Sequence, residues 1–344
     1  MQKVILGKTG IEVSKNGFGA LPIQRISKKD AVYLLQKAFC NGINYFDTAR
    51  AYSDSEEKIG AAFEYTRDKI IISTKTMAKT GEELKQDLEQ SLRMLKTDYI
   101  DIYQLHNPAF CPRPGDGSGL YEVALKAREQ GKIRHIGITN HRIAVAEEAI
   151  NSGLYDTLQF PFSYLASEAE AKLVEKCSQA NMGFIAMKAL AGGLIRNSAA
   201  AYAYMAQPQF SNAVPIWGIQ RESELDEFLL YQECPPELNA ELTSQIENDK
   251  KELAGDFCRG CGYCMPCPVG IKINNCARMS LLLRRAPADG WLSWEWQKEM
   301  ARIKDCLHCG QCKSRCPYGL DTPELLAKNL AEYESILLGL KNIR

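Results

Sequence analysis

The chain has 344 residues, which is long enough for a large folded domain together with a smaller module. Its 42 basic and 42 acidic residues balance, so the net charge favours neither a nucleic acid nor an anionic membrane as a partner. The N-terminal residues lack the apolar segment of a secretion signal, and no uninterrupted apolar run reaches membrane-spanning length. We therefore expect no association with a membrane.

Short β-rich apolar runs alternate with amphipathic helical patterns after a small hairpin predicted at Lys3–Val13. The predicted strands are Gly17–Ala20, Ile43–Asp47, Ile70–Thr74, Ile100–Leu105, His135–Thr139, Thr157–Phe160, Phe184–Met187 and Val214–Ile219. The predicted helices are Asp30–Asn41, Ser55–Glu64, Glu82–Leu95, Leu120–Gln130 and Glu168–Ala180. Such alternation predicts a (β/α)8 TIM barrel of the α/β class. No G-x-G-x-x-G follows a strand, which counts against an open dinucleotide-binding sheet.

Four chemically complementary side chains stand at or just after the ends of three predicted strands. They are Asp47, Tyr52, Lys75 and His106. In a (β/α)8 barrel the C-terminal ends of the strands meet at one mouth, so these groups are expected to converge there. The ammonium of Lys75 would favour the phenolate of Tyr52, and Asp47 would balance the lysine charge. Tyr52 could then protonate a carbonyl oxygen that His106 orients.

Eight of the thirteen cysteines form two runs near the C-terminus, each ending in Cys-Pro. The runs are Cys258, Cys261, Cys264 and Cys267, then Cys306, Cys309, Cys312 and Cys316. The second has the spacing C-x2-C-x2-C-x3-C-P, which binds [4Fe–4S] clusters in bacterial ferredoxins. Zinc sites usually take their ligands as two pairs, so zinc fits this spacing less well, and disulfides fit it less still.

Ferredoxin-type pairing exchanges the fourth cysteine between the two runs. It assigns Cys316 to the cluster of the first run, and Cys267 to the cluster of the second. The first run has one residue fewer before its last cysteine, so Cys276 is an alternative to Cys267, although Pro268 favours the earlier residue. Because thiolate clusters need a reducing compartment, we expect the cytoplasm.

The polar segment Glu247–Asp256 marks the expected boundary between two domains. We expect a barrel over residues 1–250 and an α-helical, ferredoxin-like iron–sulfur module over residues 251–344. Within the module, helices are predicted at Ile273–Arg285 and at Pro323–Leu338, with Gly339 as the stop of the second.

Three short motifs resemble the aldo-keto reductase superfamily, and the likeness extends from Leu6 to about Tyr231. The motifs are Tyr45-Phe-Asp47-Thr-Ala-Arg-Ala-Tyr52, Ser73-Thr-Lys75 and Leu105-His106. The resemblance implies a (β/α)8 barrel and nicotinamide-dependent reduction of a carbonyl, with Tyr52 as proton donor in the family's tetrad. With the cysteine runs, the whole chain resembles the ferredoxin-fused branch of that superfamily.

The same resemblance implies where the cofactor binds. The matching positions are Thr139, Asn140 and Gln159 for the carboxamide, Met187 and Lys188 near the ring, and Gly218 and Arg221 in the pyrophosphate and adenosine segment. Met187 replaces the family's stacking tyrosine, and Lys188 could hold a phosphate or an acidic substrate, or pair with a neighbouring carboxylate. From the family's preference we expect NADP rather than NAD. Glu224, however, stands where NADP-dependent members carry an arginine for the 2′-phosphate, and its charge opposes that preference.

The sequence leaves two functions open. The first is an oxidoreductase for an aldehyde or ketone, or for the corresponding alcohol, whose two [4Fe–4S] clusters connect it to an external electron partner. The second is an iron–sulfur electron-transfer protein whose barrel serves as a docking scaffold. A zinc-stapled reductase is a weaker third. A nicotinamide gives two electrons as hydride, whereas each cluster passes one at a time, so the alternative role of the clusters is only to hold the tail together.

Overall fold

The computed structural model describes residues 2–253, 257–285 and 288–342. The chain divides into two compact units. The first consists of Met1–Ala189 and Ala199–Leu242, and the second of Leu190–Ser198 and Thr243–Arg344.

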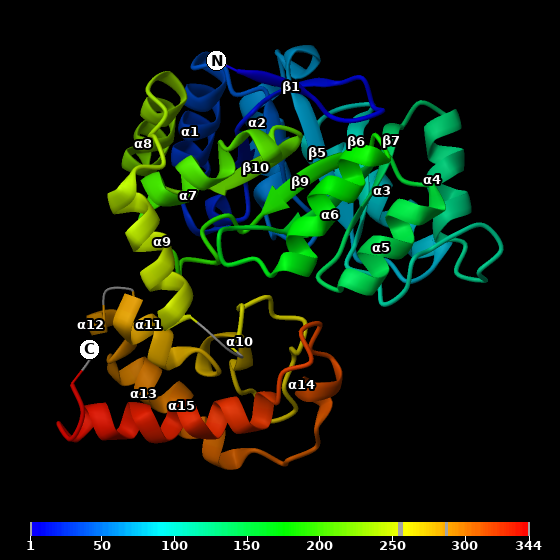
Figure 1. Ribbon diagram of the computed structural model, residues 1–344. Coiled ribbons are helices and arrows are strands. Elements are labelled where there is room, and N and C mark those ends of the chain that lie inside the picture. The colour runs from blue at the N-terminus through cyan, green and yellow to red at the C-terminus, as the bar shows by residue number, and fades with distance from the viewer. Residues whose placement is uncertain (1, 254–256, 286–287, 343–344) are drawn as a thin grey trace. The chain divides into compact units, whose positions relative to one another are not determined.

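In the described part of the first unit, parallel strands close into a barrel in the order β10-β3-β4-β5-β6-β7-β8-β9 (Figure 1). The strands are β3 Gly17–Gly19, β4 Tyr45–Asp47, β5 Ile71–Thr76, β6 Ile100–His106, β7 Ile133–Thr139, β8 Thr157–Pro161, β9 Gly183–Met187 and β10 Ala213–Gly218. The predicted (β/α)8 barrel is confirmed. The predicted hairpin is also present, as β1 Lys3–Ile5 paired with β2 Glu12–Ser14.

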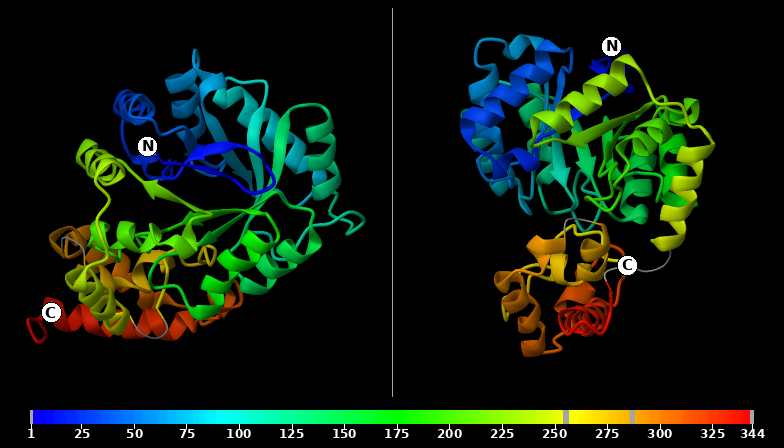
Figure 2. Two further views of the ribbon diagram at one scale, coloured as in Figure 1. Left: turned by 45° about the horizontal axis from the view of Figure 1, so that its top comes forward. Right: turned by 90° about the vertical axis from the view of Figure 1, so that its left-hand side faces the viewer.

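Helices surround the barrel on its outside, as Figure 2 shows from two further directions. They are α1 Lys28–Cys40, α2 Ser55–Phe63, α3 Gly81–Leu95, α4 Leu120–Glu129, α5 Ile143–Ser152, α6 Glu168–Gln179, α7 Ser198–Met205 and α8 Glu222–Glu233. The next helix, α9 Ala240–Glu252, begins at the end of the first unit and belongs mostly to the second. Local sequence explains several starts: the side chains of Ser27, Thr80 and Ser167 each accept a backbone N–H in the first turn of α1, α3 and α6.

The glycines of β3 are explained by close packing where the barrel closes. A Cβ on Gly17 would lie 2.6 Å from the Tyr45 ring, and one on Gly19 would lie 3.1 Å from the carbonyl oxygen of Trp217. β10 pairs with β3 at this point, Ile216 opposite Gly17. The residues that make this strand hard to recognise from propensity are therefore those that let the barrel close.

The second unit is helical in its described residues. Its helices are α10 Ile273–Cys276, α11 Met279–Arg285, α12 Ala288–Trp291, α13 Trp294–Ala301, α14 Gln311–Ser314 and α15 Thr322–Leu337. The long α15 packs against α10, α11, α13 and α14 (Figure 1). The buried core of the second unit includes Ile273, Leu282, Met300 and Tyr333.

The prediction of one continuous helix over Ile273–Arg285 is wrong at its centre, where α10 ends and α11 begins. The side chain of Asn329 on α15 satisfies the backbone there. Its amide donates to the carbonyl oxygen of Ala277 at 3.1 Å, and its carbonyl accepts the N–H of Ser280 at 2.8 Å. The carbonyl oxygen of Ala277 and the N–H of Ser280 therefore both keep a hydrogen bond although the helix is interrupted between them.

Candidate active site and cysteine clusters

The four predicted groups of the barrel lie together at the C-terminal ends of neighbouring strands. Asp47 is the last residue of β4, His106 is the last residue of β6, and Lys75 is on β5 between them. Tyr52 lies in the loop between β4 and α2. The ammonium of Lys75 is 5.3 Å from the centre of the Tyr52 ring, and the Tyr52 and His106 rings are 6.1 Å apart, edge to face.

Asp47 and Lys75 form a buried ion pair, with 2.5 Å between Nζ and Oδ1. The ammonium also donates to the carbonyl oxygen of Thr48 at 2.5 Å. Burial lowers the pKa of Lys75, and the carboxylate of Asp47 opposes that shift. The pair therefore holds a positive charge beside the Tyr52 ring at a depth where an unpaired ammonium would be costly.

Two residues that the sequence analysis missed hold the other oxygen of Asp47. Ser73 Oγ donates to Oδ2 at 3.0 Å, and Gln104 Nε2 lies 3.3 Å from the same oxygen. Ser73 is two residues before Lys75, and Gln104 is two before His106. Because alternate residues of a strand share a face, counting back by two from the predicted groups would have found both.

His106 is neutral at physiological pH. Its burial, together with the positive charges of Lys75 and Lys188, lowers its pKa to about 3. A neutral imidazole has one N–H to donate and one nitrogen to accept, so it can orient a carbonyl oxygen without adding charge.

This shift predicts a loss of stability on acidification. A histidine in the unfolded chain has a pKa of about 6.5, so below that pH the unfolded chain binds a proton that His106 does not bind in the folded protein. The free energy of unfolding therefore decreases as the pH falls. From about pH 7.5 to about pH 5.5, the wild type should lose about 1 kcal/mol more unfolding free energy than His106→Gln, measured by urea titration. Exposed His308, changed to glutamine, is the control. Equal losses in wild type and His106→Gln would contradict the assignment.

The predicted carboxamide residues differ in their present partners. Thr139 ends β7, and its hydroxyl is buried with no hydrogen-bond partner among the described residues, which suits a ligand amide. Asn140 donates to the carbonyl oxygen of Pro108 at 2.9 Å. The side chain of Gln159 accepts a hydrogen bond from Gln104 Nε2 at 2.7 Å and donates one to Asp47 Oδ1 at 3.3 Å. Thr139 therefore fits a carboxamide directly, whereas the other two would have to share or exchange a partner.

The remaining predicted cofactor residues lie at the ends of β9 and β10. Met187 ends β9, and Lys188 follows it with a positive φ of 59°. Gly218 ends β10 and is exposed, and Arg221 precedes the first turn of α8 with its side chain 70% exposed. These four are thus at the same end of the strands as the ion pair, because all the barrel strands run parallel.

Glu224 occupies the N-terminus of α8. Its Oε2 accepts the backbone N–H of Gln220 at 2.9 Å and that of Arg221 at 3.1 Å. A carboxylate thus takes the place at which a helix N-terminus would otherwise offer its N–H groups to an anion.

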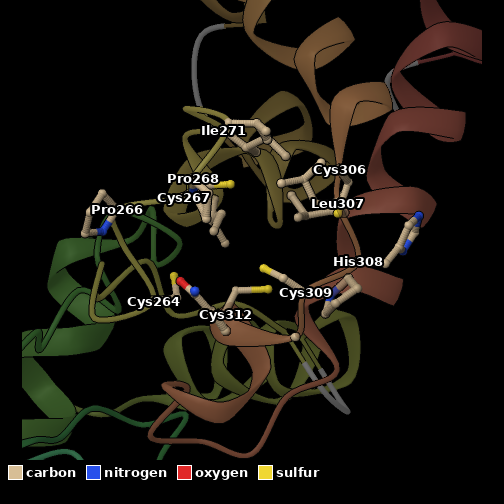
Figure 3. Close-up of a pocket in the computed structure, with 16 residues that line it drawn as sticks. Cys264, Pro266, Cys267, Pro268, Ile271, Cys306, Leu307, His308, Cys309 and Cys312 are labelled. Carbon is tan, nitrogen blue, oxygen red and sulfur yellow. The ribbon is translucent and has the colours of Figure 1, made fainter.

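The cysteines of the second unit gather around two hollows. Cys258, Cys261, Cys264 and Cys316 line the first, and Cys264, Cys267, Cys306, Cys309 and Cys312 line the second. Figure 3 shows the second, with the sulfurs of Cys309 and Cys312 directed into it and the ring of His308 directed away. Nowhere in residues 2–253, 257–285 and 288–342 do three His, Cys, Asp or Glu side chains converge as the ligands of one metal ion do.

The donor sets match the ferredoxin-type assignment. The Cys264 thiol interacts electrostatically with Cys258, Cys261 and Cys316, and burial raises its pKa to about 12. Cys264 therefore groups with the first set although it also borders the second hollow. Four soft sulfur donors around each hollow suit an iron–sulfur cluster.

Cys276 lines neither hollow. It ends α10 in the core of the unit, fully buried, and its sulfur lies 3.9 Å from the carbonyl oxygen of Glu299. Burial raises the pKa of its thiol to about 12. This placement favours Cys267 over Cys276 as the eighth ligand.

Comparison with known proteins identifies the families to which both parts of the chain are similar. A model described as the aldo/keto reductase family matches residues 15–247, and one described as a 4Fe-4S dicluster domain matches residues 257–321. L-galactose dehydrogenase of Arabidopsis thaliana is 29% identical over 227 residues, covering 60% of this chain and 71% of that protein. NADH-specific methylglyoxal reductase of Escherichia coli (strain K12) is 27% identical over 207 residues, covering 52% and 64%.

A solved aldo-keto reductase of Bacillus halodurans, in its holo form, shares the fold with a TM-score of 0.62. The two are 22% identical, and the likeness covers 72% of this chain and 96% of that one. No helix among the described residues is both long and apolar enough to cross a membrane. The chain belongs to the aldo/keto reductase family of oxidoreductases and carries a 4Fe-4S dicluster domain near its C-terminus.

Proposed function

We propose that the chain reduces an aldehyde or ketone, or oxidises the corresponding alcohol, with a nicotinamide cofactor. The convergence of Asp47, Tyr52, Lys75 and His106 at the barrel's strand ends carries this proposal. A bound reduced nicotinamide supplies the hydride that the carbonyl carbon receives. The chain's own residues supply the proton and hold the oxygen that takes it.

Each residue of the site has a distinct role. Tyr52 donates the proton to the carbonyl oxygen, and the positive charge of Lys75 stabilises the phenolate that remains. Asp47 keeps Lys75 charged in its buried position. Neutral His106 orients the oxygen by a hydrogen bond, which its edge-to-face placement against the Tyr52 ring allows.

The cofactor is held by residues of four neighbouring strands, β7, β8, β9 and β10, and of the segments that follow them. Thr139 binds the carboxamide together with Asn140 and Gln159, Met187 contacts the ring as an adaptable apolar surface, and Lys188 holds an anionic group of cofactor or substrate. Gly218 and Arg221 bind the pyrophosphate and adenosine part.

The charge of Glu224 opposes the 2′-phosphate of NADP, so we propose NAD as the preferred cofactor, against the family's tendency. Glu224→Arg is expected to raise the ratio of kcat/KM for NADPH over NADH by about tenfold or more, equivalent to about 1.4 kcal/mol. Glu237→Arg, an equal charge reversal at an exposed residue after α8, is the control and should leave the ratio unchanged. A ratio unaltered in Glu224→Arg would exclude a role in cofactor choice.

We further propose that the two cysteine sets bind two [4Fe–4S] clusters that exchange single electrons with an external carrier. The exposure of Cys309 supports this, since it brings the second cluster to the surface of the unit. The same exposure favours the alternative function, an iron–sulfur electron-transfer protein whose barrel is a docking scaffold. For either function, a reducing compartment such as the cytoplasm would keep the cysteines available as thiolates.

One anaerobic experiment separates these functions. Purified full-length protein is given NADH or NADPH, first alone and then with a panel of small aldehydes and ketones. Nicotinamide oxidation that depends on the carbonyl supports the enzyme. Bleaching of the cluster absorbance without carbonyl turnover supports the electron carrier. If no aldehyde or ketone of the panel is reduced by protein whose clusters are intact, the reductase proposal is overturned.

A further inference from the structure

Arg278 lies in the break between α10 and α11 and packs against the loop of the first cysteine run. A Cβ on Gly260 would come within 2.6 Å of the central guanidinium carbon of Arg278. Only a glycine leaves that space, and Gly260 also adopts a φ of +62°, which suits glycine. The loop between Cys258 and Cys261 is thus shaped to admit the guanidinium.

The hydrogen bonds of Arg278 are incomplete within the described residues. One terminal nitrogen donates to the carbonyl oxygen of Gly192 at 3.3 Å. The Nε atom is buried, and no described residue accepts its hydrogen bond. Its charge interacts with the sulfurs of Cys258 and Cys261. A buried donor beside two cysteine sulfurs, with no acceptor among the described residues, indicates a partner of the kind that the sulfurs of a cluster would provide.

The two cysteine sites differ in this respect. The first hollow has Arg259 in its lining and Arg278, with its buried Nε atom, against its loop. Among the described residues, the lining of the second contains no lysine or arginine. Arg302 approaches Gly270 in the loop that follows the first cysteine run, but its side chain is 45% exposed and lies beside the carboxylate of Glu299. Reduction adds one electron, and so one negative charge, to a cluster. Hydrogen bonds to the sulfurs and nearby positive charge stabilise the reduced state and raise the reduction potential.

We propose that Arg278 selectively raises the reduction potential of the cluster held by Cys258, Cys261, Cys264 and Cys316. It does so through its charge and through a hydrogen bond from Nε to sulfur. This inference rests on the proposed occupancy by two [4Fe–4S] clusters. It assigns Arg278 as a positioning and tuning residue, which neither binds substrate nor ligates iron.

The test is a redox titration of the anaerobic full-length protein, followed by electron paramagnetic resonance, which reports each cluster separately. In Arg278→Gln, one of the two reduction steps should become about tenfold less favourable, a shift of about 59 mV to lower potential for one electron. The other step should not move. Arg278→Lys keeps the charge but loses Nε, so its shift should lie between wild type and Arg278→Gln.

Arg284→Gln is the matched control, because Arg284 is on α11, is partly exposed and pairs with Glu332. It should leave both steps unchanged. Potentials unmoved in Arg278→Gln, or both steps moved equally, would overturn the inference. If iron analysis shows that Arg278→Gln has lost a cluster, the test is made with Arg278→Lys, in which one reduction step should move to lower potential and the other should not. A wild type without clusters would instead refute the proposed function.

Discussion

Tyr52→Phe is expected to lower kcat for carbonyl reduction by about 10²–10⁴-fold, the usual contribution of a positioned proton donor. The phenylalanine ring keeps the shape of the tyrosine ring and its contact with His106, and the substitution removes the hydroxyl group that carries the exchangeable proton. The dissociation constant of the nicotinamide, measured by fluorescence titration, should change little. A fall in kcat with intact cofactor binding would assign Tyr52 to the chemical step.

Tyr65→Phe provides the control for that experiment, because Tyr65 is 93% exposed. It should retain full activity. If Tyr52→Phe reduces carbonyls as fast as the wild type, the barrel is not the reductase proposed here. The electron-carrier function would then be the better explanation of the molecule.

Cys267→Ala should lose one of two clusters, so that iron falls from about eight to about four per chain. Cys267 lines the second hollow with Cys306, Cys309 and Cys312. Because Cys264 belongs to the first set, removal of Cys267 leaves three sulfur donors where a cluster needs four. Iron and sulfide analysis of protein purified without oxygen gives the result directly.

Cys276→Ala is the matched control and should keep both clusters, since Cys276 is buried in the core away from either hollow. The reverse outcome, with iron lost from Cys276→Ala and retained in Cys267→Ala, would identify Cys276 as the eighth ligand in place of Cys267. Zinc instead of iron in the wild type would contradict both cluster assignments and favour the zinc-stapled alternative.

The barrel and the convergence of the four proposed catalytic groups were predictable because both follow from regular periodicity. Asp47, Lys75 and His106 were found as polar residues at strand ends, and parallel strands bring such ends together. Ser73 and Gln104 were missed, because a serine or a glutamine inside an apolar strand does not by itself indicate a site. Each becomes a candidate only when it is noticed that it lies on the same face of its strand as Lys75 or His106. Their role emerges only when Asp47 is seen with both carboxylate oxygens bonded.

The second unit was less predictable, because its order depends on contacts between distant residues. The helical pattern over Ile273–Arg285 is uniform, and its break is bonded to Asn329, which is about fifty residues further along. The membership of Leu190–Ser198 in this unit was likewise invisible. No composition change marks that segment, and its carbonyl oxygens find their donors, Arg278 and Arg285, only in the fold.

That segment bears on how the iron–sulfur unit can be transplanted. A chain cut near residue 250 would retain Leu190–Ser198 but lose both arginines, leaving the carbonyl oxygen of Leu194 without the 2.8 Å bond it receives from Arg285. The unit is therefore not a detachable tail. Grafting the unit onto another barrel would require exchanging both the C-terminal region and the nine residues that follow Ala189. Shortening the chain to obtain the barrel alone would require redesigning those nine residues.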